Sequence, residues 1–190
     1  MNNRVFVITG AAGSGKTTVR DYLHDQYKMA RVITHTTRAP RAYERDGVDY
    51  YFEDDKSFFL TTIFWNRFTM PAITMVHRMK AWKNAWEKSP FATIVLDTAG
   101  AITYKEKLGD KAVIIFLQVG DTEELQRRMQ GRGDNADMVA KRVNSKEYNR
   151  DLQMPYELEG KAYKVINHDW QQTRAQIDQI VEKYRNEPAG

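Results

Sequence analysis

Stretches of consecutive apolar residues alternate along the chain with stretches in which apolar residues recur at helical spacing. Apolar runs typical of strands buried on both faces lie at 4–9, 31–34, 92–97, 112–119 and 163–166. Segments with the spacing or composition of helices lie at 16–27, 56–62, 79–88, 101–108, 121–130, 136–151 and 170–184. This alternation predicts an α/β fold, with a mainly parallel sheet flanked by helices on both faces.

The segment between 35 and 91 departs from that alternation. Residues 35–50 are polar and rich in arginine and aspartate, which favours a loop with edge strands. Residues 67–76 are apolar with interspersed threonines, which favours a strand. No internal repeat, low-complexity segment or linker divides the 190 residues, so we expect a single domain.

The composition indicates an ordinary globular protein. Hydrophobic residues make up 42% of the chain and charged residues 28%. The sequence contains no cysteine, which excludes a disulfide framework and thiolate metal sites. No signal-peptide pattern precedes the first strand, and no apolar run approaches the ~20 residues that span a bilayer. We therefore expect a cytoplasmic protein without membrane contact.

The formal net charge of +4 says little by itself, because charges of both signs are interspersed. The arginines, however, cluster at 38–45 and 127–150. Such clusters suit either nucleic acid or anionic phosphate substrates. The motifs in which these arginines lie favour phosphate substrates, so we expect no nucleic-acid partner.

A glycine-rich motif follows the first predicted strand. Residues 10–17 read G-A-A-G-S-G-K-T and match G-x-x-x-x-G-K-[ST] without a mismatch, between a strand and a helix as the motif requires. Backbone N–H groups of such a loop bind phosphate oxygens, the lysine reaches the β- and γ-phosphates, and the hydroxyl of the last residue ligates Mg²⁺. The predicted ATP contacts are Ala12, Gly13, Ser14, Gly15, Lys16, Thr17 and Thr18, with Thr17 also a metal ligand.

Asp97 is the predicted acidic partner for the metal. It ends the apolar run 92–96, and the carboxyl ends of parallel strands meet at one edge of a sheet. The residue can therefore converge with Gly10 on one crevice. The alternative is that Asp97 only caps the structure that follows the strand; we favour the metal role because a phosphate-binding loop of this kind uses such an acid.

The stretch 34–52 reads T-H-T-T-R-A-P-R-A-Y-E-R-D-G-V-D-Y-Y-F. It closely resembles the guanylate kinase signature S-x-T-T-R-x-P-R-x-x-E-x-x-G-x-D-Y-x-F and differs only at the first position, Thr34. Two guanidinium groups three residues apart can grip one phosphate dianion. The resemblance implies that Arg38, Arg41 and Tyr50 hold the phosphate of an acceptor monophosphate, with Arg38 also catalytic.

The resemblance extends, more loosely, toward the C-terminus. Residues 125–133 resemble the family's lid entry, and 165–169 resemble the loop that contacts adenine. By this resemblance Arg128, Arg132 and Arg142 close over the ATP phosphates, and Asn167 contacts the nucleotide. Lys16, Arg38, Arg132 and Arg142 form the expected catalytic set. The resemblance also implies a P-loop NTPase-type core at 1–33, 92–126 and 155–190, a monophosphate-binding region at 34–91 and a helical lid at 127–154.

The part of the family pattern that reads guanine is missing. Residues 56–86 contain no Asp, Glu, Gly or Tyr, and Ala99 stands where the family has a second acid after the strand. Unmatched guanine donors cost about 1–3 kcal/mol each, so guanine is not favoured in such a pocket. The candidate base contacts are Thr34, Thr69, His77 and Arg78. GMP or dGMP is the family default, but a pyrimidine or modified deoxynucleotide is a contender.

Together these features predict an ATP- and Mg²⁺-dependent nucleoside-monophosphate kinase. A family member that had become a non-catalytic scaffold should have lost Lys16 or Arg38 first, and both residues are present in this chain. Two alternatives stay open: a kinase of a sugar phosphate or other phosphomonoester, and a non-catalytic binding module of the same fold. The expected partners are ATP and the acceptor monophosphate, in a monomer or a homodimer.

Overall fold

The computed structural model describes residues 3–37, 39–40, 44–57, 85–131 and 136–187. Its centre is a five-stranded sheet in which all pairings are parallel, in the order β2-β5-β1-β6-β7. The strands are β1 (Arg4–Thr9), β2 (Ala30–Arg31), β5 (Phe91–Val95), β6 (Ala112–Gln118) and β7 (Ala162–Ile166). The expected fold class, a mainly parallel sheet flanked by helices, is confirmed.

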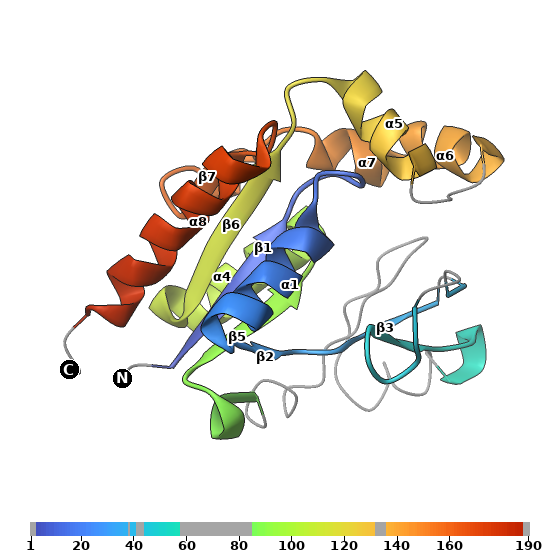
Figure 1. The fold of residues 1–190 in the computed structure, drawn as a ribbon. Coiled ribbons are helices and arrows are strands. Elements are labelled where there is room, and N and C mark those ends of the chain that lie inside the picture. The colour runs from blue at the N-terminus through green and yellow to red at the C-terminus, as the bar shows by residue number, and fades with distance from the viewer. Residues whose placement is uncertain (1–2, 38, 41–43, 58–84, 132–135, 188–190) are drawn as a thin grey trace.

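Helices cover both faces of this sheet (Figure 1). On one face, α1 (Lys16–Tyr27) and α8 (Trp170–Arg185) pack onto Phe6 and Ile8 of β1. On the other face, α4 (Thr98–Leu108) packs onto Val5 and Val7, the alternate residues of the same strand. All four of these β1 side chains are fully buried, which explains why the central strands read as unbroken apolar runs.

Three further helices form a separate cluster at the carboxyl edge of the sheet. They are α5 (Thr122–Gly131), α6 (Ala136–Val143) and α7 (Lys146–Asp151). Leu125, Met129, Val139 and Tyr148 from these helices pack with Ala11 of the glycine-rich loop. This small core places the three helices beside the loop that follows β1. At β1 the order in which the strands are added to the sheet changes direction, and ligands of such folds bind at the carboxyl end of the strands at that point.

A second, two-stranded sheet lies outside the main one. Strands β3 (Thr34–Thr36) and β4 (Tyr50–Phe52) pair in parallel, with Thr34 opposite Tyr50 and Thr36 opposite Phe52. Figure 1 shows β3 to the right of α1 and β2, on the side of the molecule away from β7. The expectation of edge strands within the polar segment 35–50 is thus partly confirmed, because β3 and β4 flank it.

Several predicted boundaries are wrong. The helix expected at 136–151 is two helices, because Ser145 is extended and its hydroxyl accepts a hydrogen bond from the Tyr148 N–H, which starts α7. The strand expected at 31–34 is divided between β2 and β3, and α4 begins at Thr98 rather than at 101 because Asp97 caps it. The strand 67–76 and most of the helices 56–62 and 79–88 lie outside the described residues.

Two short 3₁₀ turns complete the connections. They are η1 (Gly109–Lys111), which leads from α4 into β6, and η2 (Tyr156–Leu158), which leads into β7. Leu158 is fully buried in the core on the α4 face. The division into core, monophosphate-binding region and lid stays a prediction.

Candidate functional site

The glycine-rich loop has the backbone conformation that its sequence predicts. Gly10, Gly13 and Gly15 all have positive φ, at 129°, 86° and 93°. A Cβ on Gly10 would lie 2.2 Å from the Leu117 carbonyl oxygen, and one on Gly13 would lie 2.7 Å from the Leu125 carbonyl oxygen. The loop therefore needs glycine at these positions for both conformation and space.

The first turn of α1 has no side-chain cap, and Gly15 precedes it. The N–H groups of such a turn have no partner within the helix and bind phosphate oxygens well. Thr17 and Thr18 in this turn are exposed. The motif thus forms a loop that leads into an uncapped helix N-terminus, and its contacts with ATP stay a prediction.

Lys16 lies folded over the loop. Its Nζ donates to the carbonyl oxygens of Gly10, at 2.6 Å, and Ala11, at 2.8 Å. The ammonium group is thereby held at the carboxyl end of β1, between the loop and the start of α1.

Asn167 ties the C-terminal part of the chain to the same loop. Its Nδ2 donates to the Ser14 carbonyl oxygen at 2.8 Å, and its Oδ1 accepts from the Thr173 hydroxyl at 2.9 Å. A Cβ on Gly15 would lie 2.3 Å from the same Nδ2. The predicted ATP residue Asn167 is therefore beside the phosphate loop, although its amide is engaged in holding the loop's shape.

The surroundings of Ser14 show whether a phosphate group fits the glycine-rich loop 10–17. Its hydroxyl oxygen is buried and has no hydrogen-bond partner among the described residues. The same oxygen lies across the loop, 3.1 Å from where a Gly10 Cβ would be. An orphaned hydroxyl inside a ring of backbone donors suits an anionic ligand with several oxygen acceptors.

Asp97 lies next to the loop, but both of its oxygens have partners. It follows β5, whose Val95 is paired with Ile8, so Asp97 comes level with Gly10 across the sheet. Its Oδ1 accepts from the Gly100 N–H at 2.8 Å, and its Oδ2 accepts from Arg150 Nη2 at 3.0 Å. The capping role weighed as the alternative is real, and it coexists with a position suited to a metal partner.

The oxygen donors at this edge fit Mg²⁺. The Thr17 hydroxyl and the Asp97 carboxylate are hard ligands of the kind that Mg²⁺ takes, and the remaining positions are usually filled by water and substrate phosphates. Within the described ranges no group of three or more His, Asp or Glu side chains forms a metal cage.

The sequence analysis missed an ion-pair group that involves Asp97. Arg150, on α7, bridges Asp97 and Asp151, donating from Nε to Asp151 Oδ1 at 2.8 Å. Asp151 is 7% exposed and also accepts from the Thr98 hydroxyl at the start of α4. Burial alone would lower the pKa of Arg150, but the two carboxylates outweigh it and raise the pKa. The only signal in the sequence was the cluster of arginines at 127–150.

On the acceptor side, the structure describes Thr34 and Tyr50. They are paired across β3 and β4, so their side chains lie on the same face of the small sheet. Thr34 is 3% exposed, and Tyr50 is half-buried. The other predicted acceptor residues lie outside the described residues. These are Arg38, Arg41, Thr69, His77 and Arg78.

The lid arginines are only partly described. Arg128 on α5 pairs with Glu124 at 2.5 Å and donates to the Asn167 carbonyl oxygen at 3.0 Å, which places it close to the phosphate loop. Arg142 is half-buried on α6, and Arg132 lies outside the described residues. Burial raises the pKa of the Glu124 carboxyl, but hydrogen bonds from His168 and Arg128 outweigh burial and lower the pKa.

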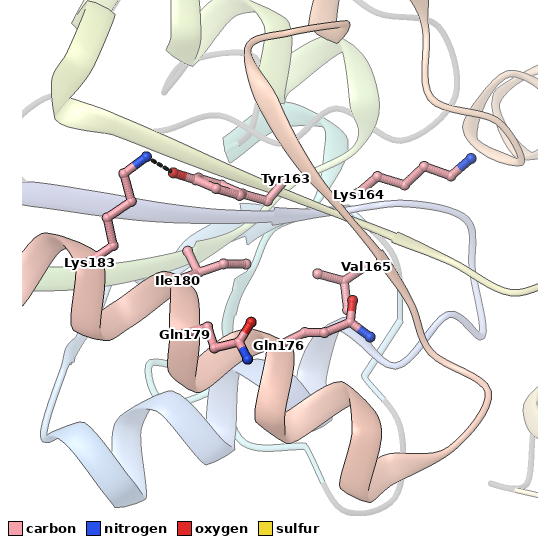
Figure 2. Close-up of a pocket in the computed structure, with 7 residues that line it drawn as sticks. All are labelled: Tyr163, Lys164, Val165, Gln176, Gln179, Ile180 and Lys183. Atoms are coloured by element: carbon pink, nitrogen blue, oxygen red, sulfur yellow. Dashed lines mark hydrogen bonds between the residues drawn. The ribbon is translucent and has the colours of Figure 1, made fainter.

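A shallow pocket of about 250 Å³ lies elsewhere, between the edge strand β7 and α8. Figure 2 shows Val165 and Ile180 against this space and the hydrogen bond of 2.9 Å from Lys183 to the Tyr163 hydroxyl at one end. None of the predicted site residues lines it. No helix in the described part of the chain is long and apolar enough to cross a membrane.

Comparison with known proteins agrees with this geometry. A sequence model of the family described as guanylate kinase matches residues 2–69. A guanylate kinase from Chlamydia felis is 30% identical over 175 residues, which cover 82% of this chain and 84% of that protein. A guanylate kinase from Anaplasma phagocytophilum is 27% identical over 190 residues, covering 93% and 85% of the two chains.

Solved structures show the same fold. The crystal structure of guanylate kinase from Anaplasma phagocytophilum superposes with a TM-score of 0.67 at 21% identity and covers 98% of this chain and 87% of that one. The sequence matches cover most of the length of each relative. The family model matches the part of the chain that contains the glycine-rich loop and the stretch 34–52. The chain therefore belongs to the guanylate kinase family.

Proposed function

We propose that this protein is an ATP-dependent nucleoside-monophosphate kinase, which transfers the γ-phosphoryl group of ATP to the phosphate of an acceptor nucleotide. The observation that carries the proposal is the phosphate cradle. It combines the glycine loop, the open N-terminus of α1, the Lys16 ammonium and the orphaned Ser14 hydroxyl at the carboxyl edge of the sheet. Membership of the guanylate kinase family supports the same reaction.

On the donor side, the chain's own groups provide charge neutralisation and alignment. Backbone N–H groups of the loop and the Lys16 ammonium hold the β- and γ-phosphates, and Arg128 lies near enough to the loop to approach them from α5. A bound Mg²⁺, held by Thr17 and Asp97, would supply further neutralisation of phosphate charge. Arg132 and Arg142 are proposed to close over the same phosphates.

On the acceptor side, Tyr50 is proposed to hold the acceptor phosphate together with Arg38 and Arg41. Thr34 shares its face of the small sheet, so a base contact and a phosphate contact are carried by neighbouring strands. Little covalent chemistry is required of the protein, because holding the acceptor oxygen in line with the γ-phosphate supplies most of what it can contribute.

The proposed acceptor is a nucleotide whose base is not read by carboxylates. Residues 56–86 contain no Asp or Glu, and Ala99 follows Asp97 by two positions. Thr34, Thr69, His77 and Arg78 offer hydroxyl, imidazole and guanidinium groups, which suit a base edge rich in carbonyl oxygens. A pyrimidine deoxynucleotide or a modified base matches these donors better than guanine does.

The test is a screen of ATP turnover with Mg²⁺ and each ribo- and deoxynucleoside monophosphate. We expect at least one monophosphate to accelerate ADP release, with the matching nucleoside diphosphate identified by anion-exchange chromatography. Ribose 5-phosphate is included to detect a base-independent kinase. ADP release that no monophosphate accelerates, with no diphosphate product, would contradict the proposal.

A Lys16→Met variant is the matched control for contaminating kinases. It should lose turnover while still showing thermal stabilisation by the accepted monophosphate, since a ligand that binds only the folded protein raises its stability. The order of activity among GMP, dGMP, dTMP and dUMP then tests the base assignment separately. Preference for GMP by a factor of ten or more would overturn the base assignment and leave the kinase assignment intact.

A further inference from the structure

Four charged side chains of alternating sign connect the main sheet, α1 and the acceptor strands. Arg31 of β2 pairs with Asp21 of α1 at 3.2 Å, and the same Asp21 oxygen pairs with Arg20 at 2.9 Å. Arg20 then reaches Asp49 at 3.5 Å, in the turn that leads into β4. The row therefore runs from β2 through α1 to the segment that carries Tyr50, and none of these four residues belongs to the site described above.

Arg20 is the centre of this row. Its side chain is 8% exposed, whereas those of Asp21 and Asp49 are 39% and 22% exposed. A guanidinium group cannot lose its proton and is costly to bury without acceptors, so its position is fixed by where carboxylates are available. Its Nε also donates to Asp21 Oδ1 at 2.9 Å, which leaves its Nη2 directed to both carboxylates.

Asp49 in turn organises the segment before β4. Its Oδ2 accepts from the Arg45 N–H at 3.0 Å, and its own N–H donates to the Arg45 carbonyl oxygen at 3.0 Å. These bonds close the turn around Gly47, whose φ is 72°, and Tyr50 follows directly. The carboxylate that meets Arg20 thus fixes the backbone immediately before the proposed acceptor-phosphate residue.

The same helix carries the donor side. Lys16 and Arg20 are four residues apart in α1, so they lie on one side of the helix, one turn from each other. The first holds the phosphate loop, and the second holds the turn before Tyr50. Arg31 adds a link near the point where the chain leaves β2 for β3.

We propose that Arg20 is a positioning residue that sets the distance between the acceptor-phosphate strand and the donor-phosphate loop, through its ion pair with Asp49. This rests on the proposed kinase function. In-line phosphoryl transfer is sensitive to such spacing, because a displacement of the acceptor oxygen removes the near-attack geometry. Arg20 itself touches neither substrate and acts through Asp49 and the turn that Asp49 holds.

The test compares Arg20→Met, Asp49→Asn and the double variant in steady-state kinetics, using the monophosphate that the wild-type protein accepts. We expect kcat/KM for the monophosphate to fall about tenfold in each variant, mainly through kcat, while the Kd for ATP changes less than twofold. The effects of the two substitutions should not add, because each breaks the same pair. Arg20→Lys should recover part of the loss, since it keeps the charge.

Arg185→Met is the matched control, because it removes an arginine from an exposed pair with Glu182 at 2.8 Å at the C-terminal end of α8, where its other described contact is the Tyr27 ring at 5.9 Å. It should leave both constants unchanged. Additive effects, an equal loss of ATP affinity, or an unchanged kcat/KM for the monophosphate in Arg20→Met would each overturn the positioning role. If the wild-type protein phosphorylates no monophosphate, the proposed function fails instead.

A structural measurement then decides the Arg20 proposal independently of turnover. Hydrogen exchange of the amides in 44–52 should be faster in Arg20→Met than in wild type and unchanged in Arg185→Met, with exchange in α1 itself unaltered. Equal exchange of 44–52 in wild type and Arg20→Met would overturn the link between Arg20 and the acceptor turn, whatever the enzyme's substrate.

Discussion

The donor half of the molecule (the five-stranded sheet with the loop 10–17 and α1) and the acceptor half (β3, β4 and the turn 44–49) are held in place by different physics. In the donor half, the loop is fixed by parallel strands, buried apolar contacts and three glycines with positive φ. The acceptor half has two three-residue strands and is joined to α1 by the ion pair of Arg20 and Asp49. Backbone conformation and apolar packing thus fix the phosphate loop, whereas the ion pair of Arg20 and Asp49 connects α1 to the acceptor half.

This difference has a functional consequence. A cradle for a phosphate common to all nucleotides gains from being rigid, since preorganised donors need no rearrangement when charge develops. A region that recognises one particular acceptor can change without damage to the cradle, because no described residue of β3 or β4 belongs to the apolar clusters that hold β1 and its loop. The absence of Asp and Glu from residues 56–86, in a chain that keeps the full G-x-x-x-x-G-K-T motif, is consistent with that separation.

The largest effect is expected from Lys16→Met in the donor half. The ammonium, now on the Gly10 and Ala11 carbonyls, would no longer be available to the transferred phosphate. We expect kcat to fall by about 10²–10³, the usual loss when one preorganised donor is removed, with little change in monophosphate affinity. Single-turnover rapid quench with saturating ATP measures this directly; a fall of less than tenfold would mean that Lys16 has another role.

Gly10→Ala tests the claim that backbone and core define the cradle. A Cβ there would meet the Leu117 carbonyl at 2.2 Å, and the φ of 129° is itself unfavourable for alanine. We expect a loss of about 1–3 kcal/mol of unfolding free energy from the conformation alone, and loss of ATP binding. Urea unfolding and calorimetry with ATP are the measurements.

Gly120→Ala is the matched control, because nothing lies within 4 Å of a Cβ at that position. It should leave stability and ATP affinity nearly unchanged. If both alanine variants behave alike, the close packing of Gly10 against β6 does not determine the loop.

Arg150→Met tests whether ion pairs also stabilise the donor half against unfolding. The substitution removes the partner of both Asp97 and the buried Asp151, which keeps only the Thr98 hydroxyl among its described side-chain partners. An ionised carboxylate left so placed costs about 1–3 kcal/mol. We expect a stability loss of about that size in urea, against at most about 1 kcal/mol for Arg185→Met on the surface. Equal losses would show that the Arg150 group contributes no more than an exposed pair.

The sequence predicts the donor half well and the group around Arg150 poorly, for a physical reason. The glycine loop is local: strand, turn and helix follow one another, so spacing alone implies the geometry of residues 4–27. Arg150 and Asp97 are 53 residues apart, and their contact depends on how α7 packs against the end of β5. The pattern of residues along the chain does not indicate a contact of this kind. It also predicted one helix at 136–151, whereas Ser145 caps the start of a separate helix, α7.

In the acceptor half the sequence predicts candidate ligands but not how the strands pair. Its motif resembles that of the family and predicts the acceptor-phosphate ligands, yet the parallel pairing of Thr34 with Tyr50 could not be derived from a polar segment with little apolar alternation. Nor did the spacing indicate that Arg20, at a buried position of an otherwise ordinary helix, would meet Asp49. Ion pairs between segments distant in sequence are specified by the packed fold.

The smallest expected effect concerns pH and the ion pairs of Glu124, which join α5 to the loop after β7. Its carboxyl pairs with Arg128 at 2.5 Å and with His168 at 3.1 Å. These partners lower the pKa of Glu124 in the folded protein below its ordinary value near about 4.3, so the folded state holds its proton less tightly than the unfolded chain. The resulting stabilisation is complete above that ordinary value and is lost as the pH falls through the folded-state pKa. Urea unfolding of wild type and Glu124→Gln should therefore differ at pH 7 and converge only as the pH falls through the lowered folded-state pKa of Glu124, whereas Glu182→Gln, in an exposed pair, should show a smaller difference at pH 7. A difference for Glu124→Gln that persists unchanged into acid would mean that the substitution acts through packing, and that charge contributes little to this junction as well.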